Sequence, residues 1–501
     1  MRIRQNKQPI RDSRKTSCPR IALGPERLRK TQRTGEHEVN RKDRRPPVSG
    51  GTRVALIDLL HAQRRCGSVF GPMPVPTVDE ARNRLYAMAA AGPALRLGLR
   101  PSAHHIHWQT APPATAVSVA PQWISPGRIP PEWFSPESVA TESDAQSACT
   151  QSIADRGRIE PEGDPLALLE SVRALPDAGL RVVCAGDLVA VDFNHGLGDV
   201  AFTQAVVDAM IGGLTMSDAH WDRYRGTTRP LLAAAIHTFG RHPGRLASLG
   251  HSRRHRLPTD DADTQRAAPP EPGPGAPIPA GAGRPPSAAT VRIPAIEMRL
   301  LRDARDRDLP GVSMFAVLTC ALVRALLDAG IDLDPAVTIP FDLRPYLPAG
   351  TDTLAPLSAG LTFRVTADTA ARTLTQMLDV ASRSGRPVAT MTIGTMREWT
   401  SRLARRHPPA PDSSLPRAQL LHSSVGRLPQ TAHTRFTDPA RAVNYTVSDP
   451  ATPTGITVTS STVGGALCVT AAFYPEYSDA TAVRAALAAL PGHVSTTLHR
   501  K

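Results

Sequence analysis

The chain has 501 residues, of which 41% are apolar and only 4% aromatic, and its formal net charge is +14. Residues 1–50 hold 15 Lys and Arg against 5 Asp and Glu, so +10 of that charge lies there and the rest of the chain predicts no basic groove for nucleic acid. No lysine lies between Lys42 and Lys501, which excludes a Schiff-base or P-loop lysine from the folded part.

The six cysteines are far apart and form no C-x-x-C pair. We interpret them as reduced thiols of a cytoplasmic protein and expect no zinc site. No apolar run approaches the roughly 18 residues that a membrane helix needs. The basic N-terminus also lacks the apolar core of a signal peptide. The sequence therefore predicts a cytoplasmic protein with no transmembrane segment.

Two segments cannot bury apolar surface. Residues 1–50 are polar and charged, which predicts a disordered basic tail, and a solvated extension is favoured over an arm that binds nucleic acid or anionic lipid. Residues 251–290 contain the stretch RAAPPEPGPGAPIPAGAGRPPSAAT, which is typical of a flexible linker. The folded part is thus predicted as an N-terminal lobe, residues 53–250, and a C-terminal lobe, residues 291–501.

The N-terminal lobe begins with a helix after Thr77, with apolar residues at helical spacing up to the break at Gly92 and Pro93. The stretch GLRVVCAGDLVAVDFNH predicts two short strands around a Gly-Asp turn. The next stretch, DVAFTQAVVDAMIGG, predicts a helix that ends at its glycine pair.

In the C-terminal lobe, VRIPAIEMRLL suits a strand, and SMFAVLTCALVRALLDAG predicts an apolar helix capped by Ser313. AVTIPFDLRPYL predicts a strand that enters a polar turn. GITVTSSTVGGALCVTAAF predicts a hairpin around Gly464 and Gly465, followed by the short helix SDATAVRAALAAL. Each lobe is therefore expected to be mixed α/β, with helices on a sheet.

The strongest candidate for chemistry is the turn NHGLGD, where His195 and Asp199 stand four residues apart between a strand and a helix. Gly196 and Gly198 permit positive φ angles and the close approach of another chain or a ligand. The motif alone is weak, because the chain has 16 histidines and the spacing arises about once by chance. Asp199 also fits a purely structural role, in which its charge interacts favourably with a helix N-terminus.

Several stretches together resemble the chloramphenicol-acetyltransferase-like superfamily, which includes condensation domains of nonribosomal peptide synthesis and polyketide-associated acyltransferases. These stretches are AAAGPALRLGLR, FNHGLGD, VTIPFDLRPYLP, HSSVGRLP and GITVTSSTVGGALCVTAAFYPE, collinear over residues 53–490. The resemblance implies two similar lobes of mixed sheet and helices with an active-site tunnel between them. The absence of DFGWG disfavours the plant branch.

The resemblance also implies an HxxxD mechanism. His195 would act as general base, taking the proton of a hydroxyl or amine that attacks a thioester of coenzyme A or of a carrier protein. Asp199 would point away and pair with Arg344, with Gly196 and Gly198 as structural support. No metal or prosthetic group would be bound. Ser460 and Ser461 are weak candidates for the oxyanion hole.

Three departures from the family pattern leave alternatives open. Asn194 replaces the first histidine, Val200 replaces the glycine after the aspartate, and Ser424 stands where many relatives carry asparagine. The alternatives are a stand-alone condensation domain that forms an amide and a non-catalytic descendant that binds a carrier protein. Acyl chain length and the acceptor stay open.

Two further features are interpreted without a function. The HHIHW stretch would place His105 on the opposite face of a strand from His104 and His107, which disfavours a metal site there. Cys320 lies in an apolar helix and is expected in the core.

Overall fold

The computed structural model describes residues 51–121, 165–227, 229–246, 249, 285–403, 417–429 and 431–499. The predicted tail and most of the predicted linker therefore lie outside the described residues. The described part contains two mixed sheets, of five and six strands, together with a two-stranded pair of β1 (Thr52–Arg53) and β3 (His107–Trp108). The expected α/β architecture of two lobes is confirmed.

The first sheet has the strand order β11-β2-β6-β5-β4. Both of its faces are buried: Val182 and Val191 pack towards helices α2 and α6, whereas Val183 and Ala190 pack towards α5. Strand residues alternate between the two faces, so this arrangement produces the nearly continuous apolar run of these strands. The elements of this lobe are α1 (Leu56–His61), β2 (Arg65–Gly71), α2 (Val78–Ala90), α3 (Pro113–Ala116), β4 (Val117–Pro121), α5 (Pro165–Arg173), β5 (Leu180–Ala185), β6 (Leu188–Asn194), α6 (Val200–Met210), α7 (Asp222–Arg225) and α8 (Pro230–Ala235).

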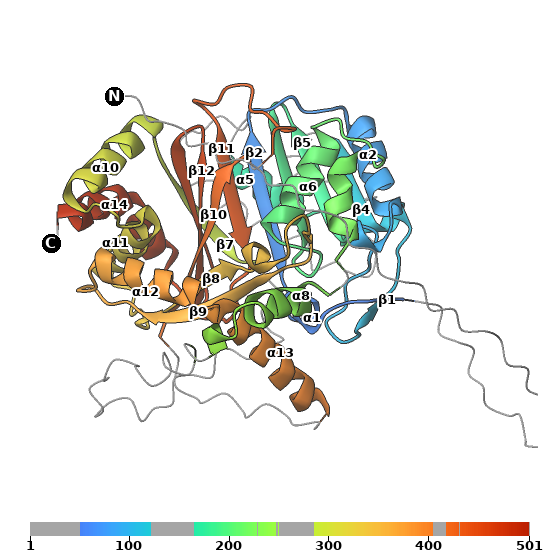
Figure 1. Cartoon of the computed structure of the whole chain (residues 1–501). Coiled ribbons are helices and arrows are strands. Elements are labelled where there is room, and N and C mark those ends of the chain that lie inside the picture. The colour runs from blue at the N-terminus through green and yellow to red at the C-terminus, as the bar shows by residue number, and fades with distance from the viewer. Residues whose placement is uncertain are drawn as a thin grey trace, which may run out of the picture. The chain divides into compact units, whose positions relative to one another are not determined.

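The second sheet has the order β7-β13-β12-β10-β8-β9. Helices α10, α11 and α14 lie together on one side of it (Figure 1), and they share a core with strand residues such as Ile339, Leu420 and Val458. Its elements are β7 (Ser287–Ile293), α10 (Ala295–Asp308), α11 (Met314–Asp328), β8 (Ala336–Asp342), β9 (Ser358–Arg364), α12 (Ala371–Arg383), α13 (Arg386–Leu403), β10 (Gln419–Leu428), β12 (Gly455–Val463), β13 (Ala466–Phe473) and α14 (Ala480–His499).

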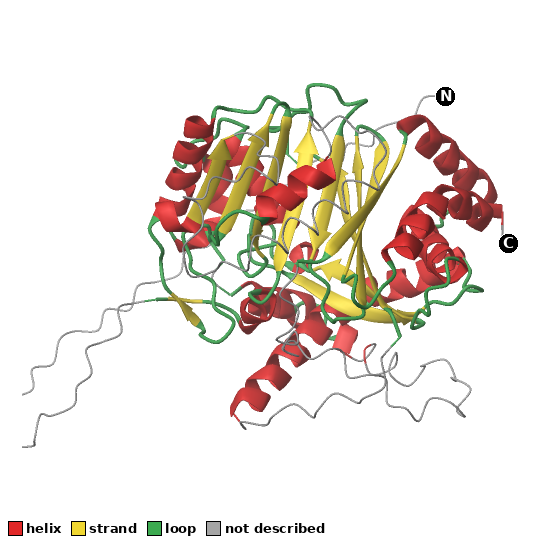
Figure 2. Cartoon of the chain, turned by 180° about the vertical axis from the view of Figure 1, so that it is seen from behind, coloured by secondary structure: helices red, strands yellow, loops and turns green. Residues whose placement is uncertain are grey.

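One strand crosses between the two halves of the chain. Strand β11 (Val443–Ser448) comes after β10 in the sequence, yet it pairs antiparallel with β2 in the first sheet. It also packs against β12 and β13, so the two sheets lie next to each other, as seen from behind in Figure 2. The C-terminal half therefore supplies the edge strand of the N-terminal sheet.

Most of the expected elements are present. Thr77 caps α2 with a capping box to Glu80, and the hairpin β12–β13 turns at Gly464 and Gly465, both with positive φ. Ser313 is the residue before α11, although its side chain makes no capping hydrogen bond. The helix expected at SDATAVRAALAAL is longer and continues through Pro491 as α14.

The strand expected over VRIPAIEMRLL is wrong in its second half. Strand β7 ends at Ile293, and α10 begins at Ala295 after Pro294. Proline has no N–H for a sheet ladder and is well suited to a helix start, and Met298 and Leu301 then bury one helical face. Strand β7 also begins at Ser287, so the last residues of the predicted linker belong to the sheet.

A buried cluster of charges stabilises the first sheet. Asp192 on β6 has no exposed surface and contacts the guanidinium groups of Arg65, Arg173 and Arg181. Burial raises the pKa of Asp192, and the three neighbouring cations offset part of that effect. Arg173 also contacts Asp449 at 3.0 Å.

We predict that Asp192→Asn lowers the free energy of unfolding by about 3 kcal/mol, because the arginines lose their shared anion. Urea titration followed by circular dichroism measures this change. Asp177→Asn is the matched control: Asp177 contacts Arg65 and Arg181, but its side chain is 89% exposed. The control should cost less than about 1 kcal/mol. Equal stability of the two variants would contradict the prediction.

Candidate active site

The turn that carries His195 is held by the residues that follow α1. The backbone N–H of His195 donates to the carbonyl of Arg64 at 2.8 Å, and the amide of Asn194 donates to the carbonyl of Ala62 at 2.9 Å. The side-chain oxygen of Asn194 accepts from the N–H of Gly196 at 2.9 Å. Asn194, which stands where the resembled superfamily has its first histidine, therefore holds the turn through both ends of its side-chain amide.

The hydrogen bonds of His195 determine which ring nitrogen is available. Its Nδ1 lies 2.7 Å from the carbonyl oxygen of Gly198. A carbonyl can only accept, so Nδ1 carries the proton and Nε2 of the neutral ring is left as an acceptor. Burial lowers the pKa of His195 below its ordinary value, although the bond to Gly198 acts in the opposite direction. The ring is thus a neutral base at neutral pH.

Gly196 and Gly198 are required because neighbouring groups lie too close to them for a side chain. A Cβ on Gly196 would lie 2.9 Å from the ring of Trp108 and 3.0 Å from Ala62, and one on Gly198 would lie 2.5 Å from the carbonyl oxygen of Leu354. Neither glycine has a positive φ. Gly196 and Gly198 therefore do not adopt the positive φ angles that glycine permits. They are needed because other chain segments approach their Cα atoms closely, as expected.

Asp199 binds Arg344, the pairing that the resemblance implied. The two carboxylate oxygens accept from Nη2 and Nη1 of Arg344 at 2.9 and 3.0 Å. They also accept from the backbone N–H groups of Ala201 and Leu357, so about four acceptor positions are all occupied. Asp199 is thereby the N-cap of α6 and a bridge between the lobes.

The guanidinium N–H groups of Arg344 are also fully hydrogen-bonded. Besides Asp199, its guanidinium donates to Asp342 at 3.1 Å and to the carbonyls of Thr353 and Ala355. These bonds use all five N–H groups of an arginine. Burial opposes the charge of Arg344, but the surrounding carboxylates outweigh it and raise its pKa above the ordinary value.

A second histidine, which the sequence analysis missed, lies beside His195. The rings of His61 and His195 have their centroids 4.4 Å apart and are tilted by 52°. Nδ1 of His61 is buried and has no hydrogen-bond partner among the described residues. Burial holds the pKa of His61 well below its ordinary value, so this ring is neutral too. Its position just before the stretch AQRR carried no periodic or motif signal.

The two oxyanion candidates are not brought to His195. Ser460 is buried between the second sheet and its helices, where its hydroxyl lies 3.3 Å from Nε2 of His422. Burial lowers the pKa of His422 to about 3, and its Nδ1 bonds Thr319 on α11. Ser461 faces the other way and donates to the carbonyl of Asn444. These hydroxyls are therefore engaged within the second sheet and its neighbours.

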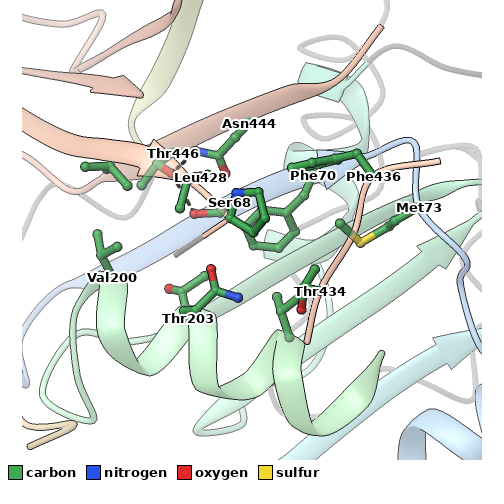
Figure 3. Close-up of a pocket in the computed structure, with 14 residues that line it drawn as sticks. Ser68, Phe70, Met73, Val200, Thr203, Leu428, Thr434, Phe436, Asn444 and Thr446 are labelled. Atoms are coloured by element: carbon green, nitrogen blue, oxygen red, sulfur yellow. Dashed lines mark hydrogen bonds between the residues drawn. The ribbon is translucent and has the colours of Figure 1, made fainter. Parts of the chain in front are cut away.

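A pocket begins at the first turn of α6, directly after Asp199. Figure 3 shows Val200 and Thr203 of α6 facing Ser68 and Phe70 of β2, with Asn444 and Thr446 of β11 on the far side. The end of β10 and the chain after it, which includes Phe436, complete the lining. The cavity volume is small, about 30 Å³. Val200, the second departure, is therefore a wall residue.

The HHIHW histidines and Cys320 lie elsewhere in the described part of the chain. Within the described part of the chain, no group of three His, Cys, Asp or Glu side chains could hold a metal ion, and no helix is long and apolar enough to cross a membrane. His104, His105 and His107 are exposed, and only His107 lies in a strand. Cys320 is fully buried in the core of the second sheet.

Comparison with known proteins gives a likeness at the level of solved structures. No protein-family model matches the chain, and no curated protein matches its sequence. The nonribosomal peptide synthetase FmoA3 is 16% identical over 91% of this chain, with a TM-score of 0.48, and this chain spans 46% of that protein.

Two further structures cover both chains almost completely. The TRI3 trichothecene 15-O-acetyltransferase of Fusarium sporotrichioides is 11% identical over 89% of this chain and 94% of its own, with a TM-score of 0.48. The condensation domain of the monacolin K polyketide synthase MokA is 14% identical over 90% and 97%, with a TM-score of 0.46. At such identities these likenesses say nothing about the reaction of this chain.

We predict that Asp199→Ala lowers the free energy of unfolding by about 3 kcal/mol, because Arg344 is left largely buried with its main anion removed. Chemical denaturation monitored by tryptophan fluorescence measures this loss. Asp342→Ala is the control, since Asp342 contacts the same guanidinium but its side chain is 53% exposed; it should cost about 1 kcal/mol or less. If Asp199→Ala is no more costly than the control, the bridge between the lobes does not depend on Asp199.

Proposed function

We propose that the protein is an acyltransferase that moves an acyl group from a thioester of coenzyme A or of a carrier protein to a hydroxyl or amine. The observation that supports this most directly is the state of His195: its Nδ1 is bound to the carbonyl of Gly198, and its Nε2 is left to act as a base. The turn is fixed on one side by α1 and on the other by Asp199 with Arg344. Such fixation is what a general base needs.

The proposed reaction balances with His195 as its one acid–base group. Nε2 takes the proton of the acceptor hydroxyl or amine while the acceptor atom attacks the thioester carbonyl. The tetrahedral intermediate then expels the thiolate as the C–S bond breaks, and the imidazolium returns its proton to the sulfur. The products are an ester or amide and a free thiol. This scheme requires no metal or prosthetic group.

The proposal leaves two choices open, the thioester donor and the acceptor group. A coenzyme A donor requires no protein partner, whereas a carrier-protein donor does, and both thioesters fit a cytoplasmic enzyme. An amine acceptor would make the protein a stand-alone condensation domain. A panel of thioesters with alcohol and amine acceptors, analysed by mass spectrometry, separates these versions.

We predict that His195→Ala lowers the rate of acyl transfer by about 10²–10⁴-fold, since it removes the general base. Thiol release and product mass measure the rate. The exposed His105 provides the control His105→Ala, which should behave as wild type. If wild type and His195→Ala are indistinguishable across the whole panel, catalysis by His195 is refuted and the protein is a non-catalytic binder.

The lowered pKa of His195 gives a pH prediction. A histidine whose pKa in the folded protein is depressed keeps its neutral form at a lower pH than a free histidine. The acid limb of kcat/KM should therefore fall below pH 6.5, the ordinary histidine value. A profile of kcat/KM from pH 4.5 to 9 measures it. An acid limb at or above pH 6.5 would show that another group, or a charged His195, controls the rate.

A further inference from the structure

An arginine that the proposed reaction does not use lies opposite His195. Strand β2 begins at Arg65, which pairs antiparallel with Asn194 at the end of β6. The next pair of the same ladder is Arg64 with His195, and the N–H of His195 donates to the carbonyl of Arg64 at 2.8 Å. Directly opposite residues of an antiparallel ladder project to the same face, with their Cβ atoms about 5 Å apart. The side chains of Arg64 and His195 therefore share one face.

The guanidinium of Arg64 has no hydrogen bond and no ion pair with the described residues. Burial lowers the pKa of Arg64, although Asp449 and Tyr474 act in the opposite direction. The carboxylate of Asp449 already binds Arg173 and the N–H of Arg65. Burial raises the pKa of Tyr474 to about 12, so its phenol supplies no negative charge. Arg64 is therefore a charged group without a counter-ion, since an arginine keeps its proton at neutral pH.

The guanidinium of Arg64 and Nε2 of His195 are both open to a ligand. Both residues are partly exposed. None of these nitrogens has a hydrogen-bond partner among the described residues, and none is among the buried unpartnered atoms, so each retains exposed surface. A small polar group can thus meet the base and the cation on the same face.

His61 lies in the same turn and offers a second donor. The N–H of Arg64 donates to the carbonyl of His61 at 3.0 Å, and the ring of His61 lies 4.4 Å from that of His195 between centroids. Nδ1 of His61 is buried without a partner, whereas Nε2 retains exposed surface. An orphaned buried N–H is rarer than an orphaned buried acceptor, which places the proton of this neutral ring on Nε2. A neutral imidazole with such an N–H can polarise a carbonyl.

We propose that Arg64 and His61 form the oxyanion hole of the reaction, in place of the two serines of β12. This inference depends on the proposed function. When Nε2 of His195 takes the proton of the acceptor, the electron pair of the C=O bond moves onto the thioester oxygen. That oxygen then accepts from the guanidinium of Arg64 and from Nε2–H of His61. When the C–S bond breaks, the pair returns to the C=O bond.

The charges around His195 favour this role. Burial is the main cause of the lowered pKa of His195, and the charge of Arg64 lowers it further. An imidazolium beside an uncompensated cation is disfavoured, whereas an oxyanion that forms at the same moment compensates both charges. The other charged groups around the turn are already paired: Asp199 with Arg344, and Arg96 with Asp58.

The first test measures kcat and KM with a thioester and acceptor that the wild type converts. Arg64→Gln should lower kcat by about 10²–10³-fold, the usual cost of removing one oxyanion donor, and change KM by less than about threefold. His61→Phe keeps a ring without its N–H and should behave alike. Arg64→Lys keeps the charge and should recover part of the loss. Arg53→Gln, the same exchange on an exposed arginine of β1, should match wild type. Equal kcat in wild type and Arg64→Gln would overturn the inference.

The pH profile adds a readout that a purely structural role would not move. Because the charge of Arg64 lowers the pKa of His195, its removal lets that pKa rise. The acid limb of kcat/KM should therefore move to higher pH in Arg64→Gln and stay close to wild type in Arg64→Lys. An acid limb that is the same in all three proteins would count against the oxyanion hole.

A binding arm separates this inference from the proposed function. S-(Trifluoroacetonyl)pantetheine hydrates to a tetrahedral carbon with acidic hydroxyls, whereas S-acetonylpantetheine remains a ketone, and pantetheine is common to both classes of donor. Calorimetry should give a Kd about 10²-fold lower for the trifluoroketone in wild type, and Arg64→Gln should lose this preference. No preference in wild type would overturn the inference and leave the proposed function to the transfer assay. The preference without transfer would keep the oxyanion site and refute the proposed function.

The alternative is that Arg64 binds a carboxylate of the substrate before the reaction begins. The acceptors n-butylamine and 4-aminobutyrate, used with one donor, distinguish the two roles. An oxyanion role lowers kcat for both amines in Arg64→Gln. A rise in KM for 4-aminobutyrate alone would assign Arg64 to a substrate carboxylate and overturn the proposal.

Discussion

The geometry of the candidate site depends on one ion pair. Asp199 and Arg344 come from opposite halves of the chain and share two hydrogen bonds. Neighbouring groups occupy the other three N–H groups of the guanidinium and the other acceptor positions of the carboxylate. A lysine could not reproduce this arrangement, because it offers a point charge and three donors instead of a planar fork. The pair fixes the start of α6, and through it the turn that carries His195. The lobes and the base are therefore held by the same interaction.

Strand β11 provides a second constraint of the same kind. It belongs to the C-terminal half but completes the N-terminal sheet beside β2. Its side chains form one wall of the pocket, while α6 forms the opposite wall and Asp208 of α6 anchors the chain before β11. The pocket and the Asp199–Arg344 ion pair thus both combine residues from the N-terminal and the C-terminal half of the chain. A shift of one lobe against the other would alter both together.

The sequence predicted the local elements well and the long-range partners less well. The hairpins around Gly186 and Gly464, the apolar helix α11 and the capped helix α2 follow from periodicity and turn residues within a few positions. The pairing of Asp199 with Arg344 came from the resemblance, since nothing local joins residues 145 positions apart.

The approach of His61 to His195 and the transfer of β11 to the first sheet had no local signal, because both are consequences of how distant elements pack. The strand assigned to VRIPAIEMRLL failed for a different reason: a short apolar run has the same composition in a strand and in a helix, and only Pro294 marks the boundary.

The three residues that depart from the pattern of the resembled superfamily, Asn194, Val200 and Ser424, contact different parts of the structure. Asn194 supplies hydrogen bonds that hold the turn. Ser424 accepts from the N–H of Gly426 at an irregular point of β10, on the strand that ends at the pocket. Val200 narrows the pocket beside α6. None of them interferes with the bond between Nδ1 of His195 and Gly198 that leaves Nε2 free. Val200 and Ser424 thus lie on the lining of the pocket and on a strand that borders it, whereas Asn194 acts on the turn that carries His195.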